Sequence, residues 1–102
     1  SNGEFVIGKF RFDVRKSTLK INEKKTIRLT AKESELLAVL CGAINNVVER
    51  EWILTSVWNN DSYYSARSMD VYISKLRKYL TIDPKISIIN IRGKGYKLLV
   101  DE

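Results

Sequence analysis

"RSMDVYISKLRKYL" at residues 67–80 and "ISIINIRGKGYKL" at residues 86–98 decide the fold of this chain. In the first stretch, apolar side chains recur at spacings of four, three and four residues: Met69, Ile73, Leu76 and Leu80. These spacings place them on one stripe of an α-helix, which can pack against a core. We therefore expect a helix over residues 66–81, ended by Asp83-Pro84, since proline disfavours helix in the residue before it.

The face opposite this stripe is polar and basic. A projection at about 100° per residue places a group of side chains broadly opposite the stripe and two more on its flank. The opposite group is Arg67, Val71, Ser74, Lys75 and Lys78, and the flanking pair is Ser68 and Tyr72. The helix is thus expected to bury one side and to present a cationic surface on the other.

The second stretch has the pattern of a β-hairpin. Strands are expected over residues 86–91 and 96–100, joined by the turn Arg92-Gly-Lys-Gly95, whose glycines allow positive φ. Residues 67–97 contain eight Lys or Arg and two Asp, whereas residues 1–66 carry ten basic and eight acidic side chains. The net charge of +6 is therefore assigned to the helix and hairpin. A basic helix beside a basic hairpin is typical of winged-helix DNA-binding domains.

The segments before residue 66 complete a small mixed fold. Alternating apolar and polar residues over 5–29 predict an antiparallel meander. Thr30-Ala-Lys-Glu33 has the pattern of a capping box, so a helix is expected over residues 31–45, ended by Asn45-Asn46. A second helix is predicted over residues 50–58, and Val47-Val48 before it is too short for more than one bridge of strand.

Length and composition set the class of protein. A chain of 102 residues fits one domain, and no segment has the length of a membrane span or the pattern of a signal peptide. Cys41 is the only cysteine, which fits a reducing, cytoplasmic compartment, and its apolar helical surroundings predict a buried thiol. Ser1-Asn2-Gly3 resembles the remnant of a cleaved tag, so the domain is expected over residues 4–102.

Three blocks of sequence resemble the DNA-binding effector domain of OmpR/PhoB-type response regulators. Leu29-Thr-Ala-Lys-Glu-Ser-Glu-Leu-Leu37 is similar to the family pattern L-T-x-x-E-F-x-L-L. Arg50-Glu-Trp-Ile-Leu-Thr-Ser-Val-Trp58 is similar to R-E-x-L-L-x-x-V-W. Residues 67–78 and Ile91-Arg-Gly-Lys-Gly-Tyr96 resemble R-[TS]-[VI]-D-V-H-I-x-x-L-R-[KR] and V-R-G-x-G-Y. The blocks follow one another in family order across nearly all of residues 5–100.

The resemblance implies an α+β fold, a winged helix-turn-helix with a four-stranded N-terminal antiparallel sheet, three helices and a C-terminal β-hairpin wing. It implies sequence-specific binding of double-stranded DNA for transcriptional regulation, with a recognition helix in the major groove and the wing at the adjacent minor groove. It also implies an N-terminal receiver domain that is absent from this chain and is phosphorylated by a sensor histidine kinase. Two copies would then bind direct repeats, whereas the isolated domain would be a weakly binding monomer without cofactor or metal.

The chain departs from the family pattern at a few positions. Ser34 replaces the usual phenylalanine of the first block, which removes a ring from the core. Tyr72 replaces the usual histidine of the recognition helix, and a tyrosine donates to phosphate or stacks but carries no cationic imidazole. Some members have arginine at the position of Ser74, so one phosphate contact is expected to be weaker here.

The residues expected to contact DNA divide into those that position and those that read. Arg67 is the better candidate for a bidentate contact to guanine, and Lys75 would reach guanine or settle on phosphate. Ser68 can bond phosphate or base, Val71 can touch a thymine methyl group, and Lys78 contacts phosphate or is simply exposed. The alternative for each of these is a solvated surface side chain.

On the wing, Arg92 is expected to enter an A·T-rich minor groove, with a contact to a turn carbonyl as the alternative. Lys94 is expected to meet phosphate, and so is Asn90. The resemblance also implies that the loop after the second helix touches RNA polymerase in some relatives: Asn59, Asn60, Asp61, Ser62, Tyr63 and Tyr64. Trp58 is expected in the core, and the tyrosine pair either marks a partner surface or covers the core.

Other readings remain beside this one. Arg77 is expected to serve the fold, with Asp70 as a possible ion-pair partner, and the scattered carboxylates are expected to be mostly paired with nearby Lys or Arg. The chain has no histidine and no Cys/His cluster, so neither an enzyme nor a usual zinc site is expected. The alternatives in function are a winged-helix module that binds protein or other nucleic acid, and the output domain of a membrane-anchored regulator. Base stacking on single strands would need exposed aromatic side chains, with Tyr72, Tyr79 and Tyr96 as candidates.

Overall fold

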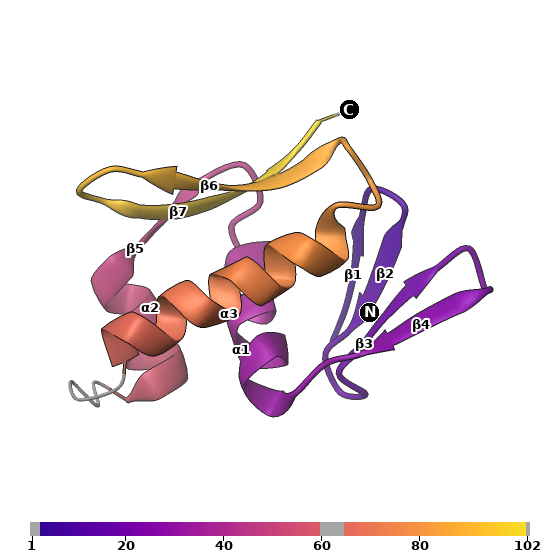
Figure 1. The fold of residues 1–102 in the computed structure, drawn as a ribbon, viewed down its shortest axis with the longest axis horizontal. Helices are drawn as coiled ribbons and strands as arrows, with labels where there is room; N and C mark the ends of the chain where they lie inside the picture. The colour runs from indigo at the N-terminus through magenta and orange to yellow at the C-terminus, as the bar shows by residue number, and fades with distance from the viewer. Residues whose placement is uncertain (1–2, 60–64, 102) are drawn as a thin grey trace.

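The computed structural model describes residues 3–59 and 65–101, which form two antiparallel sheets and three helices. The N-terminal strands are β1 (Glu4–Ile7), β2 (Phe10–Asp13), β3 (Thr18–Ile21) and β4 (Lys25–Arg28). The remaining elements are α1 (Ala31–Cys41), β5 (Val47–Glu49), α2 (Arg50–Trp58), α3 (Ser65–Leu80), β6 (Ile86–Ile91) and β7 (Gly95–Val100). Figure 1 shows the N-terminal sheet and α2 at opposite ends of the molecule, with α3 running between them. The predicted α+β architecture of a four-stranded N-terminal sheet, three helices and a C-terminal hairpin is confirmed.

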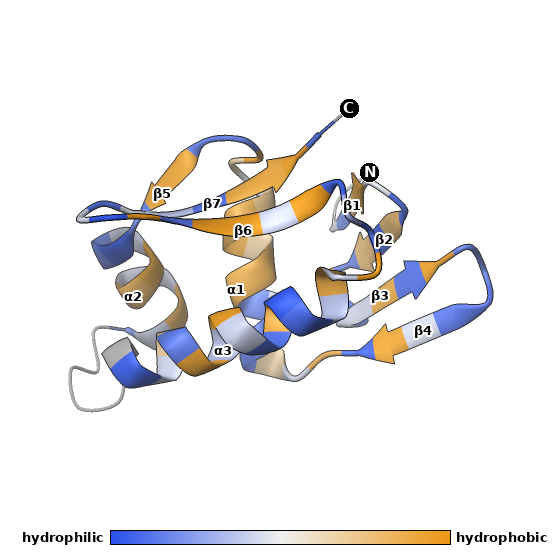
Figure 2. Ribbon diagram, turned by 45° about the horizontal axis from the view of Figure 1, so that its top comes forward, coloured by the Kyte–Doolittle hydropathy of each residue, from blue (hydrophilic) through white to orange (hydrophobic). Residues whose placement is uncertain are grey.

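The N-terminal sheet is the predicted meander, with its strands in the order β1-β2-β3-β4. Apolar and polar residues alternate along its strands, as the colouring of Figure 2 shows, and this alternation separates an apolar face from a polar one. The inward side chains are buried: Ile7, Phe10, Phe12, Leu19 and Ile21. This face covers one end of the common core.

Asp83 ties this sheet to the connection between α3 and β6. Its carboxylate accepts hydrogen bonds from the backbone N–H of Lys85 at 3.0 Å and of Lys9 at 2.9 Å. These two bonds hold the pKa of Asp83 below its ordinary value. Gly8 makes the approach possible, because its φ is 57° and an added Cβ would lie only 2.3 Å from the Asp83 carboxylate.

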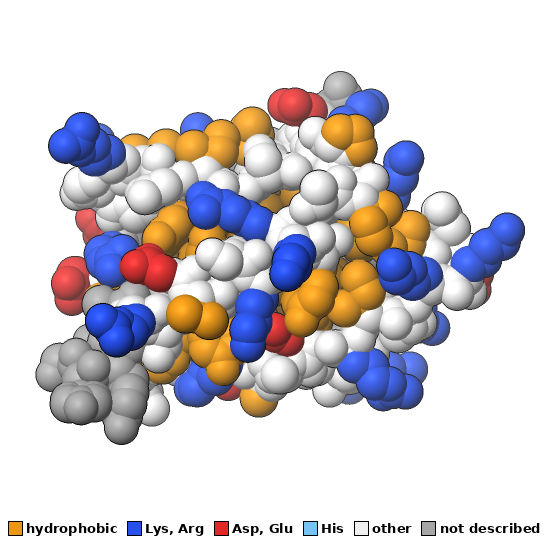
Figure 3. Space-filling view, in the orientation of Figure 1, with side chains coloured by type: hydrophobic (Ala, Val, Ile, Leu, Met, Phe, Trp, Pro, Cys, Tyr) orange, Lys and Arg blue, Asp and Glu red, His pale blue; other side chains and the backbone are white. Residues whose placement is uncertain are grey.

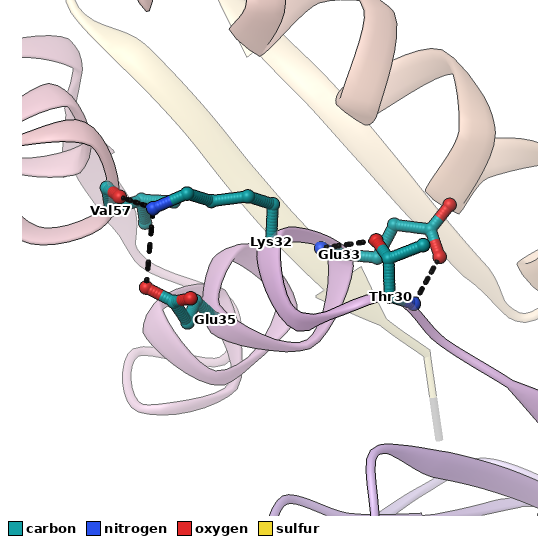
Figure 4. Close-up of polar contacts among 5 residues, drawn as sticks. All are labelled: Thr30, Lys32, Glu33, Glu35 and Val57. Atoms are coloured by element: carbon teal, nitrogen blue, oxygen red, sulfur yellow. Dashed lines mark hydrogen bonds and ion pairs between the residues drawn. The ribbon is translucent and has the colours of Figure 1, made fainter. Parts of the chain in front are cut away.

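Helix α1 starts at the predicted cap and ends earlier than predicted. Thr30 Oγ1 accepts from the Glu33 N–H at 3.2 Å, and Glu33 Oε1 accepts from the Thr30 N–H at 2.8 Å, which confirms the capping box (Figure 4). The predicted end at residue 45 was wrong, because the helix stops at Cys41 and Gly42 caps it. Glycine propagates a helix poorly, and the Ala43 N–H already bonds back only three residues, to the Leu40 carbonyl.

The wing belongs to a three-stranded sheet in the order β5-β7-β6. The expectation that Val47-Val48 forms no more than one bridge was wrong, since Val47–Glu49 pairs with β7 over three residues. Gly95 permits this pairing because an added Cβ would lie 2.0 Å from the Val48 carbonyl oxygen. The close approach of the two strands is therefore set by a glycine in β7.

Helices α2 and α3 occupy nearly the predicted ranges, and α3 is shifted by one residue at each end. The apolar stripe of α3 lies in the core, with Met69 and Leu76 at 0% exposure and Ile73 and Leu80 at 1%. Trp58 and Cys41 are buried, as the sequence predicts. The core therefore holds α3 by one side and leaves its basic side outward.

Candidate nucleic-acid interface

The outward side of α3 carries the side chains that the helical projection placed there. Those opposite the core stripe are exposed: Arg67, Val71, Ser74, Lys75 and Lys78. Ser68 and Tyr72 are half-buried on the flank. In Figure 3, Lys and Arg side chains gather over α3 and toward the end of the wing. The structure therefore brings the predicted recognition residues together on one face of one helix.

Tyr72 is part of a stack that joins α2 to α3. Its ring centroid lies 5.8 Å from that of Trp58, and the two ring planes are tilted by 50°. The Lys75 Nζ atom lies 5.1 Å from the Tyr72 ring centroid. A cation over an aromatic ring at this distance is attracted by the ring quadrupole. Tyr72 thus restrains the direction of the Lys75 ammonium, a role that the sequence alone did not indicate.

The wing turn presents the three predicted polar residues to solvent. Asn90, Arg92 and Lys94 are all exposed. Gly93 has a φ of 76° with open space around it, so this glycine supplies the turn geometry. The Arg50 N–H donates to the Lys94 carbonyl at 2.9 Å, which fastens the turn to the start of α2.

Two side-chain contacts fix the wing relative to α3. Arg77 donates from Nε at 3.1 Å and from Nη2 at 2.8 Å to the Ile88 carbonyl oxygen. The structural role expected for Arg77 is confirmed, but Asp70 is not its partner. Asp70 instead accepts a hydrogen bond from the Tyr96 hydroxyl at 3.1 Å. Burial first, and then the Asp70 carboxylate, raise the pKa of Tyr96, while the Arg50 guanidinium opposes the rise.

The internal positions of two candidate stacking residues follow from these contacts. Tyr96 is 4% exposed, and the Tyr79 hydroxyl donates to Glu33 Oε2 at 3.0 Å. Burial and this hydrogen bond raise the pKa of Tyr79. Of the three tyrosines considered for base stacking, Tyr96 is buried and Tyr79 is half-buried and bonded internally, so neither offers a free ring within the basic face.

Positive charge is not confined to α3 and the wing, where the sequence analysis assigned it. Residues 4–28 carry eight Lys or Arg and three Asp or Glu, whereas residues 29–59 carry two Lys or Arg and four Glu. The first sixty-six residues are therefore a basic sheet followed by an acidic α1–β5–α2 segment, and their charges largely offset each other in a simple sum, which is ten basic against eight acidic side chains. A count over shorter windows would have found this division. The domain has a second basic surface at its N-terminal sheet.

The expected pairing of carboxylates was mostly wrong. Within residues 3–59 and 65–101, the ion pair present is Lys32 Nζ to Glu35 Oε1 at 3.7 Å (Figure 4). Lys32 also donates to the Val57 carbonyl in the last turn of α2, where a cation is favoured by the helix dipole. Four other carboxylates accept hydrogen bonds from backbone or tyrosine groups instead: Asp13, Glu33, Asp70 and Asp83.

The loop after α2 is described only at its first residue. Asn59 is exposed and ends α2 with a left-handed backbone, at a φ of 52°. The other predicted loop residues, numbers 60–64, lie outside the described residues. Among the residues that the structure describes, no group of three or more His, Cys, Asp or Glu side chains is placed to hold a metal ion. No helix in the described ranges is long and apolar enough to cross a membrane.

Known proteins share this arrangement. The family model described as "Transcriptional regulatory protein, C terminal" matches residues 23–98. The transcriptional regulatory protein RprY of Bacteroides fragilis is 54% identical over 98 residues, which are 96% of this chain and 41% of that protein. The chain thus spans less than half the length of this curated relative.

Solved structures agree in fold. The C-terminal domain of the nisin resistance regulator NsrR is 28% identical with a TM-score of 0.76, and the match covers 95% of this chain and 98% of that one. The DNA-binding domain of the response regulator AdeR, solved in complex with an intercistronic region, is 28% identical with a TM-score of 0.71 and coverage of 91% and 96%. This chain therefore belongs to the OmpR/PhoB-type family of C-terminal transcriptional regulatory domains, the DNA-binding output domains of response regulators.

Proposed function

We propose that this domain reads duplex DNA with α3 in the major groove and with the β6–β7 turn at the adjacent minor groove. The observation that carries the proposal is the fixed pairing of two cationic surfaces. The exposed face of α3 and the turn at Arg92–Lys94 are held together by Arg77 and by the bond between Tyr96 and Asp70. A rigid pair of this kind sets the register of both elements on the duplex.

The residues expected to contact DNA from α3 have proposed tasks. Arg67 reads guanine through its planar fork, and Val71 contacts a thymine methyl group. Lys75, directed by the Tyr72 ring, reaches a base edge or the phosphate beside it. Ser68, Ser74 and Lys78 bind phosphate and position the helix. On the wing, Arg92 enters the minor groove, while Asn90 and Lys94 contact the backbone.

The first experiment selects binding sites from a random duplex pool at several salt concentrations. A specific reader recovers one half-site, and log K falls with log salt at a slope of about −0.9 per phosphate contact. Binding that never rises above that of random duplex, even for two domains joined by a linker, would contradict the proposal. A shallow slope would contradict the cationic faces as the contact surface.

Lys75→Ala tests the assignment on α3. We expect a loss of about 1–3 kcal/mol on the selected half-site, together with a changed base preference. Lys24→Ala, which removes an exposed lysine from the N-terminal sheet, serves as the control and should leave base preference unchanged. An equal loss for Lys75→Ala on specific and random duplex would reassign Lys75 to phosphate.

Arg92→Ala tests the wing. A narrow A·T-rich minor groove has the most negative potential, so the variant should lose most affinity on half-sites with A·T-rich flanks. Arg28→Ala, an exposed arginine on β4, is the matched charge control. Affinity loss that does not depend on the flanking sequence would place Arg92 on the phosphate backbone instead.

For the whole protein, we propose a cytoplasmic two-component response regulator of a bacterium. An N-terminal receiver domain, phosphorylated by a sensor histidine kinase, would pair two output domains on direct repeats. Support comes from the family and from the length of the RprY relative, of which this chain covers 41%. Residues 59–64 would face RNA polymerase, and alanine substitutions there should reduce transcription while leaving duplex affinity unchanged.

A further inference from the structure

A groove on the far side of α1 from the core is lined by α1, β5 and α2. It has a volume of about 610 Å³, and its lining is mostly apolar. Trp52 stands at this groove with 61% of its surface exposed, whereas Trp58, six residues later in the same helix, is 9% exposed. Val47 of β5 also lines the groove and is 39% exposed. An exposed tryptophan beside further apolar surface is typical of protein interaction sites.

The groove lies on the side of α1 away from α3, while Val47 and Glu49 also line a hollow with Gly93 and Lys94 of the wing turn. On α1, its lining residues Ala38, Val39 and Gly42 form a stripe about 180° from the centre of the buried side chains of that helix, which are Leu36, Leu37, Leu40 and Cys41. Helix α3 packs on α1 and is drawn in front of it in Figure 1. The stripe therefore points away from the core that α1 shares with α3, so we expect the α1 side of the groove to stay accessible when α3 lies on DNA.

The rim of the groove is acidic. Glu49 lines the groove, Glu51 follows on α2, and both are exposed without an ion pair in the described residues. Glu35 lies one turn before Val39 on the same stripe of α1. This segment carries the excess of carboxylates in a domain whose net charge is +6. Phosphate groups are repelled here, whereas Lys or Arg side chains are attracted.

We propose that this groove binds a protein segment that presents an apolar side chain flanked by Lys or Arg, while the domain is bound to DNA. The apolar side chain packs against Trp52 and Val47 in the groove. The flanking cations meet Glu49 and Glu51, which steer the approach and exclude acidic segments. The proposal does not depend on which residues of α3 and the wing contact DNA.

The test uses a displayed library of random short peptides, selected on the wild-type domain with its best duplex bound. We expect enrichment of sequences with an aromatic or branched aliphatic residue between Lys or Arg residues. The enriched peptide should bind at least about tenfold more weakly to Trp52→Ala and to Glu49→Lys/Glu51→Lys. Binding should also shift the fluorescence of Trp52 to shorter wavelength, with the shift absent in Trp52→Phe.

Matched variants guard against misfolding and against non-specific adhesion. Val6→Ala removes another exposed apolar side chain, 67% exposed on β1, and should leave peptide affinity unchanged. Glu23→Lys reverses the charge of an exposed side chain in the N-terminal sheet and should also leave peptide affinity unchanged. Trp52→Ala should retain the thermal unfolding midpoint and the duplex affinity of wild type, because the tryptophan is largely in solvent.

Several outcomes would overturn the proposal. These are a selection that yields no peptide above background, enriched peptides without basic residues, and affinity that is indifferent to Trp52→Ala. Competition between duplex and peptide would place the binding surface on the DNA face. Sedimentation that shows a dimer abolished by Trp52→Ala would make a second copy of the chain the occupant.

Discussion

Cys41 shows how position decides the chemistry of a single residue. The thiol lies near the end of α1 in the apolar interior, and burial raises its pKa to about 12. Thiolate is the reactive form, and at pH 8 almost none is present in the folded state. We expect a thiol reagent such as Ellman's reagent to modify Cys41 only when the protein unfolds, so that the labelling rate rises with urea along the unfolding transition.

Ser87→Cys provides the control for this measurement. Ser87 is exposed on β6, so the variant should react rapidly with one equivalent and slowly with the second. Rapid labelling of Cys41 in the native protein would show that the end of α1 opens locally, which is not expected for a side chain that is only 4% exposed.

At the scale of elements, Arg77 and Lys78 are neighbours on α3 with different tasks. Arg77 is bonded to the Ile88 carbonyl of β6, whereas Lys78 is exposed and has no bond in the described structure. Arg77→Ala should lower the free energy of unfolding by about 1–3 kcal/mol, as expected for loss of charge-assisted hydrogen bonds. Lys78→Ala should leave stability unchanged and should reduce the salt slope of duplex binding by about one contact.

Urea unfolding and salt-dependent binding of the two variants separate these tasks. Arg77→Lys is an informative third variant, because it keeps the positive charge but cannot donate two hydrogen bonds from one planar group to the Ile88 carbonyl oxygen. If Arg77→Lys restored stability fully, charge rather than geometry would hold the wing to α3. A reduced salt slope for Arg77→Ala with unchanged stability would instead move Arg77 into the set of DNA contacts.

Sequence patterns correctly predicted the helix boundaries that depend on residues close by in the chain. The capping box fixed the start of α1, and the apolar spacing placed α3 to within one residue. The end of α1 and the strand β5 were mispredicted, because a glycine cap and pairing with β7 decided them. The contacts among Trp58, Tyr72 and Lys75 join α2 to α3. Residue spacing within one helix could not predict them, because the two aromatic residues belong to different helices.

For the whole molecule, positive charge lies on two surfaces, the N-terminal sheet and the face formed by α3 and the wing, while the α1–β5–α2 segment carries an excess of carboxylates. The basic N-terminal sheet lies at the opposite end of the long axis from α2 (Figure 1). Two free domains of net charge +6 repel each other, which supports the expectation of a monomer in solution. Duplex DNA neutralises this repulsion, so pairing is expected on DNA rather than before it.

A domain that is forced to dimerise tests whether pairing on DNA raises the affinity for repeated half-sites. Fusing a parallel coiled coil through a flexible linker before residue 4 makes the second binding event intramolecular, and affinity should rise by roughly 10²–10⁴ without a new contact. The gain should appear on direct repeats about one helical turn, or 34–36 Å, apart, a spacing close to the 39 Å length of the domain. A single half-site should bind the dimer and the monomer about equally. Equal gains on single and repeated half-sites would mean that the coiled coil adds non-specific affinity. A preference for inverted repeats would mean that the two domains bind in a symmetric arrangement and not head to tail on direct repeats.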